Sequence, residues 1–241
     1  MDGPLVLKFG GSVLTSEAAL ERAAGWVADE ERRSPGPGGT LVVVSAFGAT
    51  TDQLLARAAE LHPDHADRVA VLAATGEEGA AALFDMALVA AGRMPALVDA
   101  GALGITTEGP LLDADPVAFE SAHLVGALAR TGLAVVPGFV GRTAGGATSL
   151  LGRGGSDLTA LFLAHHLGAR ACVLLKDVEG IHEHDPKAAP GTARLERVAL
   201  ADLAPYAGRV LQPKAAAFAA RVGRAFSLGR PDAPELRTQV G

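Results

Sequence analysis

The sequence is poor in features that mark several classes of protein. It has one cysteine, Cys172, in 241 residues, so it can form neither an internal disulfide nor a metal site made of cysteines alone. This usage fits a reducing compartment, and we expect a cytoplasmic protein. Aromatic residues make up 4% of the chain, which argues against a stacking platform for nucleic-acid bases.

Positive charge and long apolar runs are also scarce. The chain has 21 basic and 27 acidic residues, a formal net charge of -6 at pH 7, and no basic block. The electrostatic signature of a protein that binds nucleic acid or an anionic membrane is therefore missing. The longest apolar stretches, such as 80–91, are interrupted well before the roughly 18 to 20 residues that cross a bilayer. We expect no nucleic-acid or membrane partner.

What is present is an alternation of short apolar runs with helical patterns. The runs that predict strands are 4–9, 40–44, 95–98, 133–139, 171–175 and 224–228. The segments that predict helices are 17–31, 51–60, 67–91, 119–130, 158–167, 200–206 and 213–222. His62-Pro63 is expected to end one helix, Ser156 or Asp157 to cap another, and 178–190 to form a loop or hairpin. This alternation predicts a single domain with a mainly parallel sheet covered by helices on both faces.

Two glycine-rich turns each follow a predicted strand and precede a predicted helix. They are Gly-Gly-Ser at 10–12 and Gly-Arg-Gly-Gly-Ser-Asp at 152–157. Turns in this position present unpaired backbone N–H groups to an anion. Neither is a P-loop, and the first lacks the Gly-x-Gly-x-x-Gly pattern of a dinucleotide fold. Together they indicate a phosphate-handling site, although the first alone is also compatible with a plain tight turn.

Lysine is rare, and one lysine stands in an unusual place. The chain has four lysines among its 21 basic residues: Lys8, Lys176, Lys187 and Lys214. Lys8 lies inside an apolar strand pattern directly before the first glycine turn. A buried ammonium group needs a partner, and an anionic ligand would supply one. The alternative is a lysine whose stem follows the strand end and whose charge reaches solvent.

Six segments carry a more specific signal. They are Lys-Phe-Gly-Gly-Ser at 8–12, the run at 42–55, Thr-Gly-Glu at 75–77, the run at 151–160, Lys-Asp-Val-Glu-Gly-Ile at 176–181 and Val-Leu-Gln-Pro at 210–213. In content and order they resemble the catalytic domain of aspartokinases, in the amino acid kinase family. The resemblance implies a three-layer αβα sandwich with a central, mostly parallel, eight-stranded sheet. It also implies an amino-acid lobe at about 1–150 and a nucleotide lobe at about 151–241.

The activity that the resemblance implies is ATP-dependent phosphorylation of the side-chain carboxylate of aspartate, or of a close analogue, to an acyl phosphate, with ATP and Mg²⁺. A carboxylate nucleophile is already ionised at pH 7, so cations and backbone N–H groups suffice and no general base is needed. Two alternatives stay open. One is a kinase for another amino acid or small acid of the same superfamily, and the other is a non-catalytic nucleotide-binding regulatory subunit.

The resemblance also assigns roles to residues. Lys8 is expected to neutralise the transferred phosphoryl group, and Asp157 to organise Lys8 and the substrate's ammonium group. The phosphate-binding residues are expected to be Gly10, Gly11, Ser12, Ser45 and Arg209. The substrate-binding residues are expected to be Thr51, Glu77, Arg153, Gly154, Gly155 and Ser156. The nucleotide-binding residues are expected to be Lys176, Asp177, His182, Asp185, Pro186 and Lys187. We predict no metal-binding residues, because a histidine beside an aspartate in a loop is more typical of a solvated polar contact.

Four positions depart from the aspartokinase pattern. Aspartokinases usually have Thr or Ser where this chain has Lys176, and Tyr where it has His182. They usually have Arg in place of Lys187 and Lys in place of Arg209. The last two exchanges keep the charge and change its geometry.

Aspartokinases commonly continue into regulatory ACT domains. This sequence stops at Gly241, so we expect no ACT domain and no inhibition by lysine, threonine or methionine unless a separate regulatory or downstream pathway subunit supplies it. Analogy with the family also implies a homodimer.

Overall fold

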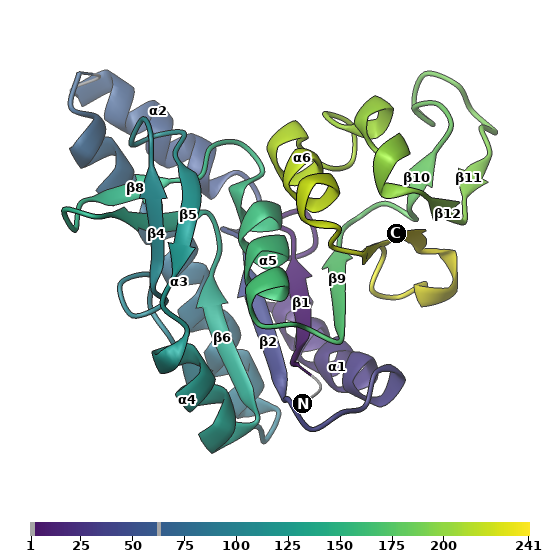
Figure 1. Ribbon diagram of the computed structural model, residues 1–241, viewed down its shortest axis with the longest axis horizontal. Helices are drawn as coiled ribbons and strands as arrows, with labels where there is room; N and C mark the ends of the chain where they lie inside the picture. The colour runs from purple at the N-terminus through teal and green to yellow at the C-terminus, as the bar shows by residue number, and fades with distance from the viewer. Residues whose placement is uncertain (1–2, 62–63) are drawn as a thin grey trace.

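An eight-stranded sheet forms the centre of the molecule (Figure 1). The structure, a computed structural model, describes residues 3–61 and 64–241; the predicted break at 62–63 lies outside the described residues. Neighbouring strands are parallel except for β13 and β14, which are antiparallel. In sheet order the strands are β12 (Arg197–Val198), β14 (Thr238–Val240), β13 (Phe226–Gly229), β9 (Ala171–Leu175), β1 (Leu5–Phe9), β2 (Thr40–Val44), β6 (Leu133–Pro137) and β3 (Ala96–Leu97).

Helices cover both faces of this sheet, which confirms the predicted three-layer α/β architecture. The α-helices are α1 (Glu17–Arg33), α2 (Thr50–Leu61), α3 (Ala66–Ala90), α4 (Ala122–Thr131), α5 (Gly155–His166) and α6 (Pro213–Val222). Helices α1 and α3 pack on one face, and α4, α5 and α6 pack on the other. Strands covered on both sides favour apolar residues at nearly every position, which is why β1 apart from Lys8, and β2 apart from Thr40, are apolar runs.

The one charged residue of β1 is placed by the alternation of side chains along the strand. Leu5, Leu7 and Phe9 belong to the core beneath α1 and α3, whereas Val6 belongs to the core beneath α5. Successive residues of a strand point to opposite faces, so Lys8 shares the face of Val6. The Lys8 side chain therefore lies in the layer of α5, and the residue as a whole is 5% exposed.

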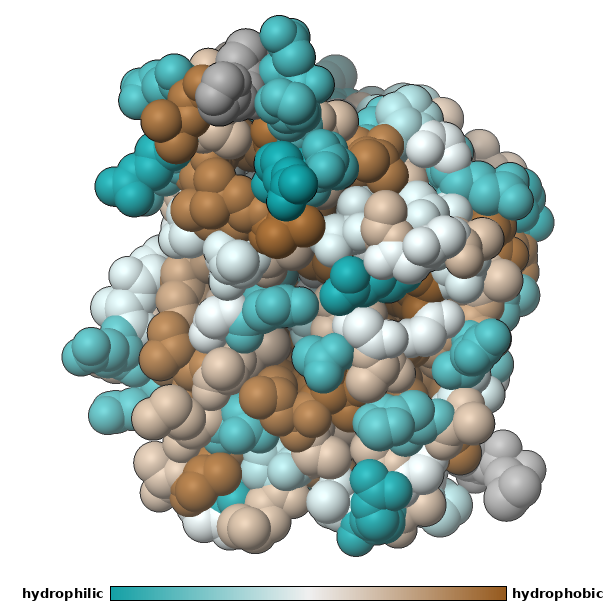
Figure 2. Space-filling view, turned by 90° about the vertical axis from the view of Figure 1, so that its left-hand side faces the viewer, coloured by the Kyte–Doolittle hydropathy of each residue, from teal (hydrophilic) through white to brown (hydrophobic). Residues whose placement is uncertain are grey.

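Two smaller sheets accompany the main one; the first was not predicted, and the second overlaps segment 178–190, which was predicted as a loop or hairpin. The first has four strands in the order β5 (Asp115–Phe119), β4 (Ile105–Glu108), β7 (Val140–Thr143) and β8 (Thr148–Leu150). The second is the hairpin of β10 (Ile181–His182) and β11 (Arg194–Leu195). Figure 2 views the molecule from the side that carries the four-stranded sheet, and apolar and polar residues are mixed there. Val117 of β5 is 48% exposed, so this sheet lacks the apolar run of a buried strand.

Several predicted boundaries are wrong for identifiable reasons. The predicted helix 119–130 begins at Ala122, because Phe119 ends β5. Segment 200–206 forms two short 3₁₀ helices, Leu200–Asp202 and Ala204–Tyr206, and a third spans Pro234–Leu236.

Helix α5 begins earlier than predicted, and neither proposed side chain caps it. Its N-cap is Gly154 at φ 75°, and no side chain caps the helix. Ser156 and Asp157 instead bond to residues of other elements, Ser156 to Glu77 and Asp157 to Lys176.

A buried ion pair fixes the end of the chain to α1. Arg237 donates two hydrogen bonds of 2.9 Å to the Glu30 carboxylate, and the two residues are 6% and 3% exposed. Arg33 contacts the same carboxylate at 3.0 Å, but its side chain is 45% exposed. Breaking a buried pair leaves an uncompensated charge, whereas an exposed partner contributes little.

We therefore expect Arg237→Ala to lower the free energy of unfolding by about 3 kcal/mol and Arg33→Ala by less than about 1 kcal/mol. Urea denaturation of both variants measures the difference. Equal losses would show that burial does not decide the strength of these two contacts.

Candidate active site

A cavity of about 700 Å³ lies beside the residues that follow three parallel strands of the main sheet. Gly10 and Gly11 follow β1, Ser45 follows β2, and Lys176 follows β9. Ligands of open α/β sheets bind outside the carboxyl ends of the strands. The predicted site residues on its wall are Lys8, Gly10, Gly11, Ser12, Ser45, Thr51, Glu77, Arg153, Gly154, Gly155, Ser156, Asp157, Lys176, Asp177 and Arg209.

A second cavity of about 540 Å³ adjoins the first and shares Asp177 and Arg209 with it. The other predicted residues line this second cavity: His182, Asp185, Pro186 and Lys187. The structure thus brings every predicted site residue to one of two neighbouring cavities.

The first glycine turn passes very close to the chain that follows β2. A Cβ atom on Gly11 would lie 2.3 Å from the carbonyl oxygen of Ala46, so a side chain there would push the two segments apart. The Gly10 N–H donates to the Leu175 carbonyl at 3.0 Å, which fixes the turn against the end of β9. Ser12 donates to the Asp177 carboxylate at 2.8 Å. The turn is therefore tied to both neighbours of β1.

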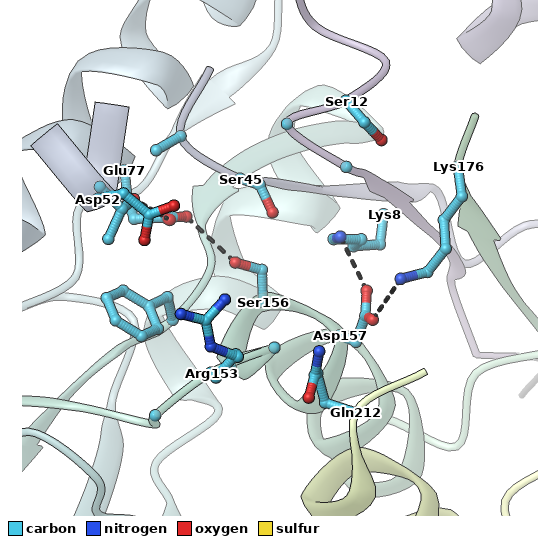
Figure 3. Close-up of a pocket in the computed structure, with 18 of the residues that line it drawn as sticks. Lys8, Ser12, Ser45, Asp52, Glu77, Arg153, Ser156, Asp157, Lys176 and Gln212 are labelled. Atoms are coloured by element: carbon cyan, nitrogen blue, oxygen red, sulfur yellow. Dashed lines mark hydrogen bonds and ion pairs between the residues drawn. The ribbon is translucent and has the colours of Figure 1, made fainter. Parts of the chain in front are cut away.

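Asp157, in the first turn of α5, holds two lysines (Figure 3). The Lys8 ammonium lies 2.8 Å from Oδ1, and the Lys176 ammonium lies 2.6 Å from Oδ2. The Asp157 side chain is 3% exposed, the Lys8 side chain 6% and the Lys176 side chain 17%. Lys176 is thus the more accessible of the two cations.

Burial and charge act in opposite directions on this cluster. Burial alone would raise the pKa of Asp157, but the charges of Lys8 and Lys176 outweigh it and lower that pKa to about 2. Burial lowers the pKa of Lys8, and the neighbouring Lys176 lowers it further, against the opposing effect of Asp157. The carboxylate is therefore ionised at neutral pH, and it favours the charged form of Lys8.

Glu77 lies on the opposite side of the cavity, where α3 passes the start of α5 (Figure 3). It is 4% exposed and accepts a hydrogen bond of 3.2 Å from Ser156 and a long one of 3.5 Å from Thr51. Burial raises the pKa of Glu77 from its ordinary value of 4.5 to about 7, although the Ala46 backbone and Lys8 oppose the shift. Because burial disfavours the ionised form of this carboxyl, a cationic ligand that binds beside it would stabilise that form.

The second glycine turn carries Arg153 into the cavity. Gly152 and Gly154 both have a φ of 75°, and a Cβ atom on Gly154 would lie 2.1 Å from the Gln212 side chain. In Figure 3 the Arg153 guanidinium extends from this turn toward Ser156 and Glu77. Within residues 3–61 and 64–241, no acidic side chain forms an ion pair with it. An exposed, unpaired guanidinium in a cavity suits a carboxylate ligand.

The second cavity is lined by three of the residues that depart from the aspartokinase pattern, His182, Lys187 and Arg209. Arg209 donates to the Pro205 carbonyl at 3.0 Å, and its guanidinium lies 5.3 Å from the centroid of the Tyr206 ring. In the backbone register of the β10–β11 hairpin, His182 lies opposite Arg194. In the part of the chain that the structure describes, no group of three or more His, Cys, Asp or Glu residues is placed to hold a metal ion.

The model of the amino acid kinase family matches residues 3–223. The chain belongs to this family. Aspartokinases from Thermus thermophilus and Geobacillus stearothermophilus are 35% and 33% identical to it over 91% and 90% of its length. The chain spans about half the length of these curated relatives, 54% of each.

Solved structures of the same family share the fold. The aspartate kinase of Synechocystis superposes with a TM-score of 0.83 at 26% identity, covering 99% of this chain and 39% of that one. Aspartokinase III of E. coli, in complex with aspartate and ADP, superposes with a TM-score of 0.82 at 24% identity, covering 98% of this chain and 64% of that one. Among the described residues of this amino acid kinase, no helix is long and apolar enough to cross a membrane.

The wall of the first cavity also contains residues that were not predicted as site residues, among them Asp52, Leu112, Phe139 and Gln212. Phe139 is unusual, because it is a bulky residue with a φ of 68°. Its N–H donates to Thr159 Oγ1 at 3.0 Å, and its carbonyl accepts from the Leu151 N–H at 2.8 Å. Both partners are distant from Phe139 in the sequence, since Thr159 lies in α5 and Leu151 precedes that helix. No local sequence pattern therefore signals this conformation.

The Glu77 pKa makes stability depend on pH. The pKa of Glu77 is raised in the folded state, so its protonated form stabilises the fold. This contribution to the free energy of unfolding is complete below pH 4.5 and is lost as pH rises through about 7. Glu77→Gln removes this loss. Relative to wild type, the variant should therefore gain about 3 kcal/mol of unfolding free energy between pH 4.5 and 8. Urea denaturation over this range measures the change, with Glu78→Gln as the control on the same helix. A difference that stays constant with pH contradicts the assignment.

Proposed function

We propose that this chain transfers the γ-phosphoryl group of ATP to the side-chain carboxylate of aspartate. The observation that carries the proposal is the composition of one cavity. The cluster of Lys8, Asp157 and Lys176 lies on one side, and Glu77 and the unpaired Arg153 lie on the other. Cations for phosphate thus face a carboxyl and a guanidinium that complement the ammonium and carboxylate of an amino acid. The names of the relatives, aspartokinases, point to the same reaction.

In the proposed reaction a carboxylate oxygen of aspartate attacks the γ-phosphorus, and the bond from that phosphorus to the bridging oxygen breaks. ADP leaves with the electron pair, and no proton needs to move. The protein must then orient the two anions and offset their charge. Lys8 neutralises the transferred group, Asp157 keeps Lys8 in place, and Gly11 presents its N–H group, whereas the Gly10 N–H is bonded to the Leu175 carbonyl. Ser45 lies on the same wall of the cavity.

Substrate binding uses the other side of the cavity. Glu77 accepts the α-ammonium group, with Thr51 and Ser156 holding its two oxygens. Arg153 pairs with the α-carboxylate, and the Gly154–Gly155 backbone lets the substrate approach α5 closely. The adjoining cavity, with His182, Asp185, Pro186 and Lys187, takes the nucleoside, and Asp177 and Arg209 lie where the two cavities meet. We therefore propose an amino-acid lobe at about 1–150 and a nucleotide lobe at about 151–241, with the turn that carries Arg153 reaching from the second lobe into the amino-acid site.

Mg²⁺ accompanies ATP in most kinases, bound by one or two protein carboxylates and by the phosphates themselves. The described residues provide no complete set of protein ligands, but Asp177 lines both cavities. This donor set fits a metal that arrives with the nucleotide, and Asp177 would hold it. When bound, the ion offsets phosphate charge.

The test is to incubate the chain with ATP, Mg²⁺ and aspartate and to trap the acyl phosphate as its hydroxamate. We expect ADP release and hydroxamate formation in equal amounts. Lys8→Ala should lower kcat by at least about 100-fold, because the transition state loses a cation. Arg130→Ala, which removes an exposed cation on α4, is the control and should leave kcat unchanged.

Other outcomes distinguish the alternatives. Hydroxamate formed with glutamate or another acid in place of aspartate would keep the reaction and change the substrate. Nucleotide binding without ADP release for any acceptor would indicate a non-catalytic subunit. Full activity of folded Lys8→Ala would remove Lys8 from the mechanism.

A further inference from the structure

We propose that Lys176 is a second phosphate-binding cation, which gives the cluster of Lys8, Asp157 and Lys176 its net positive charge. The proposal rests on the proposed function, in that phosphates must enter this cavity. It concerns a position at which aspartokinases usually have a neutral threonine or serine. Lys176 thus changes the charge of the site.

The charge count supports this role. Lys8 and Asp157 form a one-to-one ion pair that is almost completely buried, and such a pair carries no net charge toward a ligand. Lys176 bonds to the second oxygen of the same carboxylate, so the three groups together carry one net positive charge. Asp177 lines the same cavity, accepts a hydrogen bond from Ser12 and adds a negative charge outside this cluster. The excess cation of the three-residue cluster is therefore Lys176.

The geometry leaves Lys176 free to bind a ligand. An ammonium group has three donors, and Asp157 takes one of those of Lys176 at 2.6 Å. The side chain is 17% exposed, against 6% for Lys8, and both lysines line the same cavity. Its backbone is fixed, because its N–H donates to the Gly229 carbonyl at 3.0 Å. A phosphate group that approaches Lys8 therefore meets Lys176 from the side of β9.

The rival interpretation is that Lys176 only stabilises the Asp157 carboxylate. The two interpretations differ in whether a bound phosphate covers the Lys176 ammonium group. A phosphate-binding cation should matter little for AMP and more for ADP and ATP, and its own reactivity should fall when phosphate binds. A lysine that acts only through Asp157 should keep its reactivity in the presence of phosphate.

The main experiment measures the affinity of AMP, ADP and a non-hydrolysable ATP analogue by calorimetry, with Lys176→Met and Lys176→Arg. Met keeps most of the stem and removes the charge, and Arg keeps the charge. We expect Lys176→Met to weaken binding of ADP and of the analogue about tenfold and that of AMP less than about twofold, with Lys176→Arg recovering most of the loss. Arg130→Met controls for the change in net charge. Equal effects on the three nucleotides, or no effect, would overturn the proposal.

A measurement on the unsubstituted protein avoids the question of whether variants fold. Lysine acylation by an N-hydroxysuccinimide ester is followed at Lys176 by mass spectrometry. Pyrophosphate and ADP should slow the reaction at Lys176, and adenosine should not. Protection by adenosine, or no protection by pyrophosphate, would contradict the proposal.

Failure of this proposal and failure of the proposed function give different results. A chain that binds ADP through Lys176 but forms no acyl phosphate keeps this inference and loses the function. A chain that phosphorylates aspartate, with ADP affinity unchanged in Lys176→Met, keeps the function and loses this inference.

Discussion

The site depends on one buried carboxylate that holds two lysines. Asp157 would be costly to bury alone, and Lys8 would be costly to bury in the middle of an apolar sheet. Each makes the burial of the other possible, and their contact joins β1 to α5. Lys176 adds the end of β9 to the same contact. Three elements of the core are thus fixed around the point where, on the proposed function, phosphate charge must be offset.

The layered fold could be predicted because its signals are local. Strands β1, β2 and β9 lie between helices, so each is an apolar run apart from Lys8 and Thr40, and α1, α3 and α6 show helical patterns. The four-stranded sheet could not be predicted in this way. Strand β5 is exposed at Asp115, Ala118 and Val117, and β8 has three residues. These strands form through pairing with distant segments, which no local pattern records.

The site was predicted through ordered motifs, which placed all of its expected residues on two adjoining cavities. The motifs did not reveal how those residues contact one another. Lys176 was assigned to the nucleotide, and its bond to Asp157 follows from the packing of α5 against β9. Ser156 and Asp157 resemble helix caps in the sequence, but their side chains bond to residues of other elements. The local pattern and the tertiary contact compete for the same side chain, and the tertiary contact wins.

The most direct test of the central claim is to compare turnover and ADP affinity in Asp157→Asn. If Asp157 positions the lysines while the lysines bind phosphate, removing its charge should lower kcat at least about 100-fold and keep ADP affinity within about threefold. Calorimetry and the hydroxamate assay on the same preparation give both values. A variant that keeps its turnover and loses its affinity for ADP would contradict the account.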